Sequence, residues 1–348
     1  MFNVNKIVPD EIKKLEPYTS ARETFQGKNL IFMDANENPY GNRYNRYPDP
    51  LQEKLKQQLS TTMGISTEQL FAGNGSDEII DLVIRSFCKP GVNNLITINP
   101  SYGMYEVLAS VNRIKTVKAT LTEDFQINPD EILKQCDRQT KLAILCSPNN
   151  PTGNMLKDKD VEKVLQSFPG IVLVDEAYIE FSGTDGLKRK ILEYPNLIIT
   201  RTLSKAWGLA GIRLGYAICH PEIVTILSKV KYPYNVNNIT QEKAIKALKK
   251  PQRMRRTVRT ILREKQKVIE ALKKLNCVEK IYPSDANFIL MKTGYSKNII
   301  NFLRERNIIV RDRSNLHRCK NCIRITIGTR KQNNRLINHM QQFEKINT

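Results

Sequence analysis

Four short apolar runs recur through the middle of the chain, with helix-like segments between them. They are Leu95–Ile98, Leu142–Cys146, Ile171–Val174 and Leu197–Thr200. Each run is nearly continuous in apolar side chains and does not alternate with polar ones, which is typical of strands buried on both faces. The succession of such strands and helices predicts an α/β fold with a mostly parallel central sheet covered by helices.

The pattern changes after about residue 235. A basic run at 253–267 carries Val258, Ile261 and Leu262 at helical spacing, which predicts an amphipathic helix with a cationic outer face. Strand-like runs at 286–290 and 323–327, with a helix-like segment at 298–307 between them, predict a smaller α+β unit. We therefore expect three parts: an N-terminal arm (1–40) packing with the small domain, a large domain (41–235) and a small C-terminal domain (236–348).

Composition places the chain among ordinary globular proteins. Of its 348 residues, 40% are hydrophobic and 26% are charged. No apolar run approaches the ~20 residues that span a bilayer, and the first 20 residues lack the apolar core of a secretory signal. Seven cysteines in mostly apolar contexts indicate reduced thiols. These features predict a cytoplasmic protein with no membrane partner.

Two features of the sequence could indicate nucleic-acid binding or a zinc site, but neither is well supported. The net charge of +20 could attract nucleic acid, but no nucleic-acid motif accompanies it, so no nucleic-acid partner is expected. The pair Cys319 and Cys322, with His317 nearby, could suggest a zinc site. A structural zinc site needs four ligands, and the sequence, which has only three histidines, offers no second such pair. No metal is expected.

The segment from Gly73 to Phe87 predicts an anion site. A Gly-Asn-Gly turn leads into a helix whose apolar face is Ile79, Ile80, Val83, Ile84 and Phe87. Ser76 or Asp77 would cap the helix, and free backbone N–H groups there attract an anion. A Rossmann dinucleotide site is not supported, because the third glycine of its fingerprint is absent.

Further polar residues follow the predicted strands, where the sites of such sheets form. Asn150 lies in a turn after one strand, Asp175 ends another, and Lys205 follows a third. Lys205 and Arg213 are isolated cations in an apolar segment, so each is expected to have an assigned partner. Arg324 lies inside a strand-like run and would need an anionic partner such as a carboxylate or phosphate.

The order of these features resembles fold-type I pyridoxal-phosphate enzymes of the class I/II aminotransferase family. The resemblance runs over nearly the whole chain. Within that family it resembles the histidinol-phosphate aminotransferases, through the segments EPYTSARE, DANENPYG, NRYPDPLQ, SPNNPTG, VDEAYIEF, TLSKAWGLAGIRLGY and CIRITIGTR.

The resemblance implies a role for each candidate residue. Lys205 would carry pyridoxal 5′-phosphate as a covalent aldimine and act with Asp175 and Tyr178 in catalysis. The coenzyme would be bound by Ser76, Asp77, Tyr102, Asn150, Asp175, Tyr178, Ser204, Lys205 and Arg213, with Tyr47 reaching its phosphate from the other subunit of a homodimer. The substrates would be bound by Tyr18, Arg311 and Arg324.

The implied reaction is transamination of L-histidinol phosphate with 2-oxoglutarate, giving imidazole acetol phosphate and L-glutamate in histidine biosynthesis. Two alternatives within the same fold stay open: a decarboxylase of phosphothreonine, and an aminotransferase of broader specificity for aromatic amino acids. From another class comes a nucleic-acid-binding regulator, but the chain has no room for an added DNA-binding domain.

Overall fold

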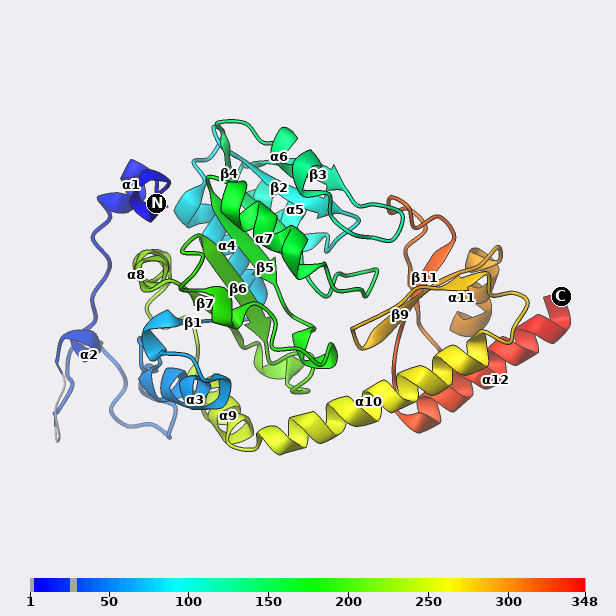
Figure 1. Cartoon of the computed structure of the whole chain (residues 1–348). Helices are drawn as coiled ribbons and strands as arrows, with labels where there is room; N and C mark the ends of the chain where they lie inside the picture. Colours follow the sequence, from blue (N-terminus) through cyan, green and yellow to red (C-terminus); the bar gives the residue numbers. More distant parts are fainter. Residues whose placement is uncertain (1–2, 26–29, 348) are drawn as a thin grey trace.

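The computed structural model describes residues 3–25 and 30–347 and shows an α/β fold with two sheets (Figure 1). The larger sheet has seven strands in the order β1-β7-β6-β5-β4-β2-β3. They are β1 (Leu70–Gly73), β2 (Asn94–Asn99), β3 (Lys115–Thr120), β4 (Thr140–Cys146), β5 (Ile171–Asp175), β6 (Leu197–Thr202) and β7 (Gly215–Cys219). The strands β3, β2, β4, β5 and β6 run parallel, whereas β7 is antiparallel to both of its neighbours. The predicted fold class is confirmed.

Helices cover both faces of this sheet (Figure 1). On one face α4 contacts α5 and α8, and on the other α6 and α7 contact one another. The helices of this part are α3 (Glu53–Met63), α4 (Ser76–Phe87), α5 (Met104–Val111), α6 (Pro129–Lys134), α7 (Asp158–Ser167), α8 (Pro221–Val230) and α9 (Asn238–Leu248). Strands covered on both faces explain why the four predicted runs are continuously apolar.

The helix α4 shows how the pattern positions the site. Its five predicted core residues are all fully buried, and they fix the helix against β1, β6 and β7. The N-cap is Gly75, in the left-handed region at φ 84°, and no side chain caps the helix. The expectation that Ser76 or Asp77 would cap it is therefore wrong, because both lie inside the first turn. The first N–H groups of α4 stay available for an anion.

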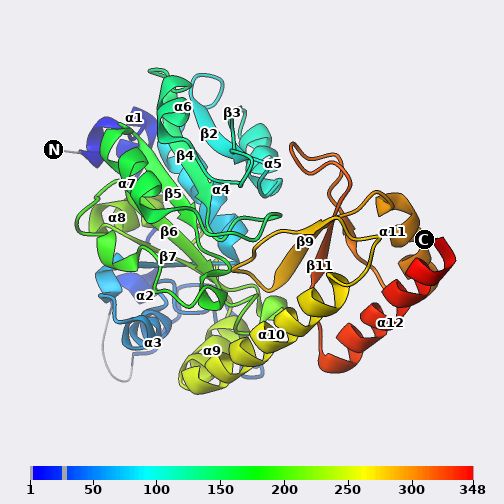
Figure 2. The same cartoon turned by 45° about the vertical axis from the view of Figure 1, so that its right-hand side comes forward.

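The smaller part is an antiparallel sheet backed by helices. Its order is β10-β11-β9-β8, with β8 (Lys280–Ile281), β9 (Phe288–Lys292), β10 (Arg311–Asp312) and β11 (Cys322–Thr326). Three helices, α10 (Pro251–Leu272), α11 (Ser296–Glu305) and α12 (Arg330–Asn347), surround a second core that includes Leu272, Met291 and Phe343. The 22-residue α10 leads from the larger part to the smaller one (Figures 1 and 2).

The N-terminal arm differs from its expected packing. It contains the short helices α1 (Asp10–Lys13) and α2 (Ala21–Thr24). Val4 and Val8 are buried in the core of the larger part, and α1 contacts α8 there. The expected packing of the arm with the small domain is thus incorrect for this stretch, because its apolar side chains are buried against the large sheet's helices.

The domain division itself stays a proposal. Ala244 and Leu248 of α9 belong to the larger core, and α9 packs against α3. The second core instead draws on Val268 and Leu272 in the later turns of α10. We therefore propose moving the boundary from residue 236 into α10.

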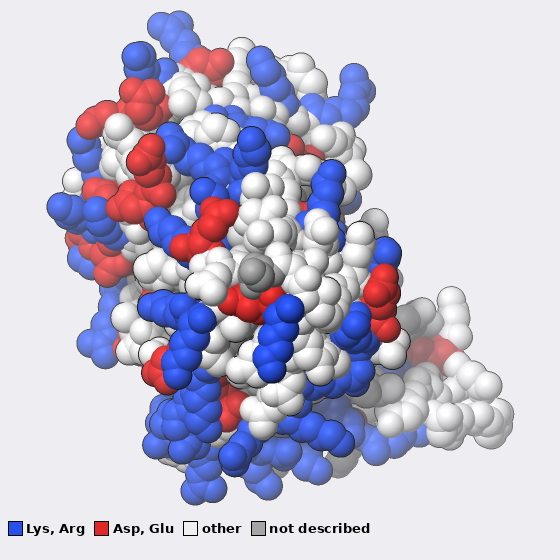
Figure 3. Space-filling model, turned by 90° about the vertical axis from the view of Figure 1, so that its right-hand side faces the viewer, with Lys and Arg blue, Asp and Glu red and all other residues white. Residues whose placement is uncertain are grey.

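The surface is strongly basic. Lys and Arg side chains cover much of the face shown in Figure 3, with acidic side chains between them. Within the described ranges, no helix combines the length and the apolar character that crossing a membrane requires.

Candidate functional site

A cavity of about 220 Å³ lies where β4, β5 and β6 end and α4 begins. It brings together ten of the residues singled out from the sequence: Ser76, Asp77, Tyr102, Asn150, Asp175, Tyr178, Ser204, Lys205, Arg213 and Arg324. Residues from both sheets line it, so the cavity lies between the two parts of the chain. Its position follows from the sheet, since parallel strands deliver their terminal residues to one edge.

Asp175 is held at the floor of the cavity. It is only 3% exposed, accepts a hydrogen bond of 2.7 Å from the Tyr105 hydroxyl and accepts another of 3.1 Å from the Ala177 N–H. Burial raises the pKa of the Asp175 carboxyl, and the hydrogen bond from Tyr105 opposes that shift. The carboxyl is oriented by these two donors, and it can pair with a cationic group placed in the cavity.

Lys205 faces the same cavity from the loop after β6. Its Nζ lies 5.6 Å from the ring centroid of Tyr178. The side chain opens into the cavity, yet protein surrounds enough of it that burial lowers its pKa, and the nearby Arg324 lowers it further. Asp175 and Asp77 oppose this change. A lowered pKa favours the neutral amine, which is the nucleophilic form of a lysine.

An anion cradle forms at the start of α4. Gly75 has φ 84°, a backbone conformation that favours glycine, and an added Cβ would lie 2.8 Å from Arg213 Nη2. Arg213 makes a 3.4 Å contact with Asp77 and remains half-exposed. The hydroxyl of Ser204 is buried with no hydrogen-bond partner in the described chain. An unpaired hydroxyl, a guanidinium and free N–H groups together fit a phosphate.

Arginines define the opposite end of the cavity. Arg324 of β11 donates to Asn150 Oδ1, and its guanidinium lies 5.3 Å from the ring centroid of Phe288. Arg313 lines the cavity beside it, whereas Arg311 is exposed and does not line it. Within residues 3–25 and 30–347, no acidic side chain forms an ion pair with any of these three arginines. This end can therefore accept an anion.

Besides Arg311, two expected site residues lie outside the cavity in the single chain. Tyr18 is 73% exposed and lines a separate hollow against α8. Tyr47 stacks on Tyr234 with centroids 4.4 Å apart and is outside the cavity. Its backbone is fixed by Glu37, which accepts from the Tyr47 N–H and from Arg22 and Arg46. Tyr47 thus sits on a braced segment, but it does not reach the cavity of its own chain.

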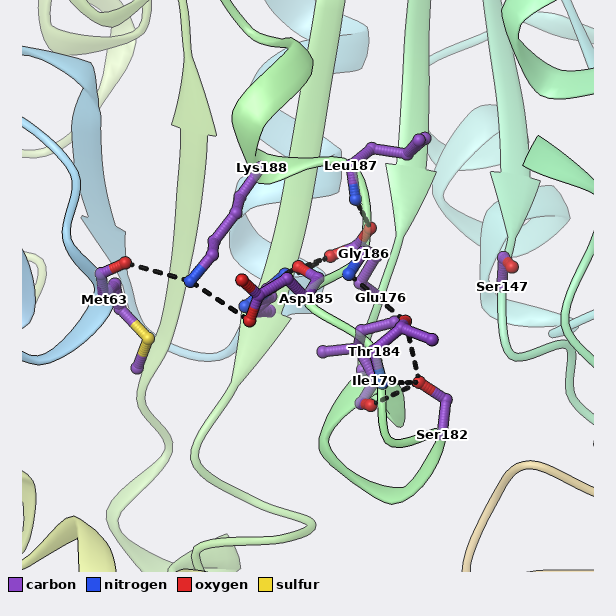
Figure 4. Close-up of polar contacts among 12 residues, drawn as sticks. Met63, Ser147, Glu176, Ile179, Ser182, Thr184, Asp185, Gly186, Leu187 and Lys188 are labelled. Atoms are coloured by element: carbon purple, nitrogen blue, oxygen red, sulfur yellow. Dashed lines mark hydrogen bonds and ion pairs between the residues drawn. The ribbon is translucent and has the colours of Figure 1, made fainter. Parts of the chain in front are cut away.

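A buried ion pair supports the floor of the site. Glu176, next to Asp175, accepts bonds of 2.9 and 2.6 Å from Arg201 of β6, and both side chains are buried. Glu176 also accepts the Leu187 N–H, and Arg201 donates to the Asp185 carbonyl, so the pair holds the loop 182–188 to the sheet (Figure 4). Figure 4 also shows Lys188 contacting Asp185 and the Met63 carbonyl.

Sequence reasoning missed several residues that line or support the site. Arg313, Cys146 and Thr202 line the cavity, and Tyr105 binds Asp175 from 70 residues away. Cys146 and Thr202 could have been found, because each ends a predicted strand at the same edge as Asp175. No local signal points to Tyr105, which lies in an ordinary helix. Arg313 lies two residues from Arg311, and the parity of side chains along an extended segment could have suggested it.

The donor set fits pyridoxal phosphate. The buried, unpartnered Ser204 hydroxyl, the Gly75 cradle beside Arg213 and the uncapped α4 terminus match a phosphate group. Asp175 and Lys205 line the same cavity, so they could hold a protonated ring nitrogen and bond an aldehyde carbon, respectively. Among the described residues, no group of three or more His, Cys, Asp or Glu side chains could hold a metal.

The chain is similar to known proteins. The family described as "Aminotransferase class I and II" matches residues 25–340. A histidinol-phosphate aminotransferase of Parabacteroides distasonis is 47% identical over 344 residues, covering 99% of this chain and 100% of that protein.

Two solved structures have the same fold. The histidinol-phosphate aminotransferase of Clostridium acetobutylicum aligns with a TM-score of 0.81 and 26% identity, over 87% of this chain and 92% of that one. The enzyme of the same name from Sinorhizobium meliloti, solved in complex with pyridoxal-5′-phosphate, aligns with a TM-score of 0.78 and 23% identity, over 86% and 84%. The chain therefore belongs to the class I and II aminotransferases and, within them, to the histidinol-phosphate aminotransferase family.

Proposed function

We propose that the protein uses pyridoxal 5′-phosphate to transfer the amino group of L-histidinol phosphate to 2-oxoglutarate, giving imidazole acetol phosphate and L-glutamate in histidine biosynthesis. One observation carries the proposal. A lysine of lowered pKa and a buried carboxylate share a cavity with Arg313 and Arg324, which have no acidic partner among the described residues. Such a cavity suits an amine substrate that also carries an anionic group.

The coenzyme, when bound, would supply an electron sink for the carbanion formed at the substrate's α-carbon. Lys205 would hold the coenzyme covalently and, once displaced by the substrate amine, would use its neutral Nζ to take the α-proton and return it. Asp175, oriented by Tyr105, would keep the ring nitrogen protonated by ion pairing. Tyr178 and Asn150 would donate hydrogen bonds to the ring oxygen, and Tyr102 would stack on the ring.

The phosphate of the coenzyme would lie in the cradle at α4. The N–H groups of Ser76 and Asp77, the Ser204 hydroxyl and Arg213 would donate to it. Burial raises the pKa of Tyr102 to about 12, and Asp77 adds to the shift, so the phenol is neutral at physiological pH. A neutral phenol adds no charge beside the phosphate.

The arginines would bind the substrates' anionic groups. Histidinol phosphate carries a phosphate and no carboxylate, whereas 2-oxoglutarate carries two carboxylates. Arg324 and Arg311 would bind the phosphate of histidinol phosphate in one half-reaction and a carboxylate of 2-oxoglutarate in the other. Tyr18 would add a contact if the arm closes over the cavity.

We also propose a homodimer with shared sites, in the cytoplasm. Tyr47 lies outside its own cavity, on a braced segment that follows an arm exposing Ile31, Met33 and Tyr40. Apolar side chains exposed at this density favour burial against a second copy, where Tyr47 would meet the partner's coenzyme phosphate. The seven cysteines are free thiols, which suits a reducing compartment. Sedimentation analysis should give a dimer, and a monomer would contradict the shared site.

Product analysis tests the reaction. The purified protein with L-histidinol phosphate and 2-oxoglutarate should form stoichiometric L-glutamate and imidazole acetol phosphate. Release of carbon dioxide from phosphothreonine, with no glutamate formed from histidinol phosphate, would transfer the function to the decarboxylase alternative. Equal specificity constants for histidinol phosphate and for aromatic amino acids would instead favour the broader aminotransferase.

A further inference from the structure

Three arginines face one way at the junction of the two parts of the chain. Arg311 and Arg324 are directly opposite one another in the β10–β11 pair, so their side chains lie on the same face. Arg313 follows two residues after Arg311, and its N–H continues the pairing by donating to the Cys322 carbonyl at 2.9 Å. The period-two rule places Arg313 on that face as well. Of these three arginines, Arg313 and Arg324 line the cavity and Arg311 does not.

Among the described residues, no acidic side chain pairs with the Arg313 cation. Its Nε is buried without a hydrogen-bond partner in the described ranges, and the same holds for the Nε of Arg324. Burial, together with the charges of Arg324 and Arg311, lowers the pKa of Arg313 to about 10. Tyr178 and Cys319, which also face it, are neutral at physiological pH. Keeping such a cation beside two others is costly unless an anion joins them.

The loop that carries Arg313 is firmly anchored. Successive turns run through it, with Leu316 N–H donating to the Arg313 carbonyl and Cys319 N–H to the Leu316 carbonyl, each at 3.0 Å. Cys319 and Cys322 are fully buried in the core of the larger part, and Leu316 packs against that core. The guanidinium is therefore presented from a fixed backbone, which limits the entropy lost when it binds a ligand.

We propose that Arg313 is a substrate-binding residue that, together with Arg324, selects a phosphate monoester. A carboxylate carries one negative charge and is balanced by one guanidinium, whereas a phosphate monoester carries nearly two and is balanced by a pair. Arg311, exposed at the rim, then has the smaller role. The proposal deepens the proposed function, on which the identity of the phosphate-bearing substrate rests.

The test compares each substrate with its dephosphorylated form. In the holoenzyme, the specificity constant for L-histidinol phosphate divided by that for L-histidinol measures what the phosphate contributes. Arg313→Gln should lower this ratio by roughly 30-fold or more, whereas Arg311→Gln should lower it less. Arg313→Lys should recover part of the ratio, because a point charge replaces the planar fork. The half-reaction with 2-oxoglutarate should change less in Arg313→Gln than the half-reaction with histidinol phosphate.

Each alternative outcome is distinguishable. An equal loss on L-histidinol and its phosphate, or a larger effect of Arg311→Gln on the ratio, overturns the assignment of Arg313. If the wild-type holoenzyme ignores L-histidinol phosphate, the proposed function fails. The same ratio is then measured on O-phosphothreonine and threonine, where a drop in Arg313→Gln supports the phosphate site and an unchanged ratio overturns it. Unaltered thermal melting of Arg313→Gln shows that the loop still folds.

Discussion

The two ends of the cavity differ in whether their charged side chains have partners within the protein. At the large-sheet end Asp175 has its donors, Glu176 has Arg201, and the side chains are fixed before any ligand arrives. At the small-sheet end Arg313 and Arg324 have no acidic partner in the described chain. The first end is preorganised for chemistry, and the second is a charged receptor. This difference suits an enzyme with one fixed coenzyme and two exchanging substrates.

The largest effect on turnover is expected for a change at Lys205, between the two ends of the cavity. Lys205→Ala should abolish multiple turnovers, because it removes both the covalent anchor and the proton carrier. Steady-state glutamate formation measures this. Lys243→Ala, which removes a lysine from a separate hollow, is the control and should retain activity. Continued turnover of the Lys205 variant would show that another group carries the proton.

The next prediction concerns the buried ion pair that supports the large-sheet end. Arg201→Gln leaves Glu176 buried without its charge partner and should lower the free energy of unfolding by about 3–5 kcal/mol. Urea denaturation measures the loss. Arg189→Gln removes an exposed pair with Asp185 in the same region and should cost less than about 1 kcal/mol. Similar losses in the two variants would mean that the buried pair has no special weight.

Glu180 differs from the other buried carboxyl groups near the large-sheet end. Burial raises its pKa from an ordinary 4.5 to about 7, although Arg201 opposes the shift. Between these pH values the folded protein holds a proton on Glu180 that the unfolded chain has released. The free energy of unfolding therefore falls as pH rises through this window, by about 3 kcal/mol in all.

Glu180→Gln should remove that loss, so the variant should gain stability relative to the wild type between pH 5 and pH 8. Urea midpoints across this range measure it. Glu193→Gln, at an exposed site, should leave the slope unchanged. A parallel pH dependence of wild type and Glu180→Gln would show that Glu180 titrates normally.

A smaller change is expected at the Asp175 donor. Tyr105→Phe removes a hydrogen bond to a buried carboxylate, so the pKa of Asp175 should rise and kcat should fall about tenfold. The acid limb of the pH–rate profile should then move to higher pH. Tyr194→Phe, which loses a hydrogen bond from Gln166 outside the cavity, should leave that limb in place. No movement in Tyr105→Phe would detach Tyr105 from the site.

The two ends also differ in how far the sequence predicts them. Asp175 and Lys205 follow buried strands, so periodicity alone places them at one edge. Arg313 lies outside regular structure, and its direction is set by a loop that closes through Cys322. Tyr105 meets Asp175 only through packing of α5 on the sheet. The arm's packing was mispredicted for the same reason, since Val4 and Val8 carry no local signal of the surface they bury against.

An absorbance spectrum of the purified holoenzyme, with L-histidinol phosphate added in the absence of any keto acid, tests the central claim most directly. The account predicts that the visible band of the lysine-bound coenzyme disappears as the amino group is transferred, and that 2-oxoglutarate restores it. Lys205→Ala should lack the original band. A wild-type band that ignores L-histidinol phosphate, or a protein that binds no coenzyme, would contradict the account.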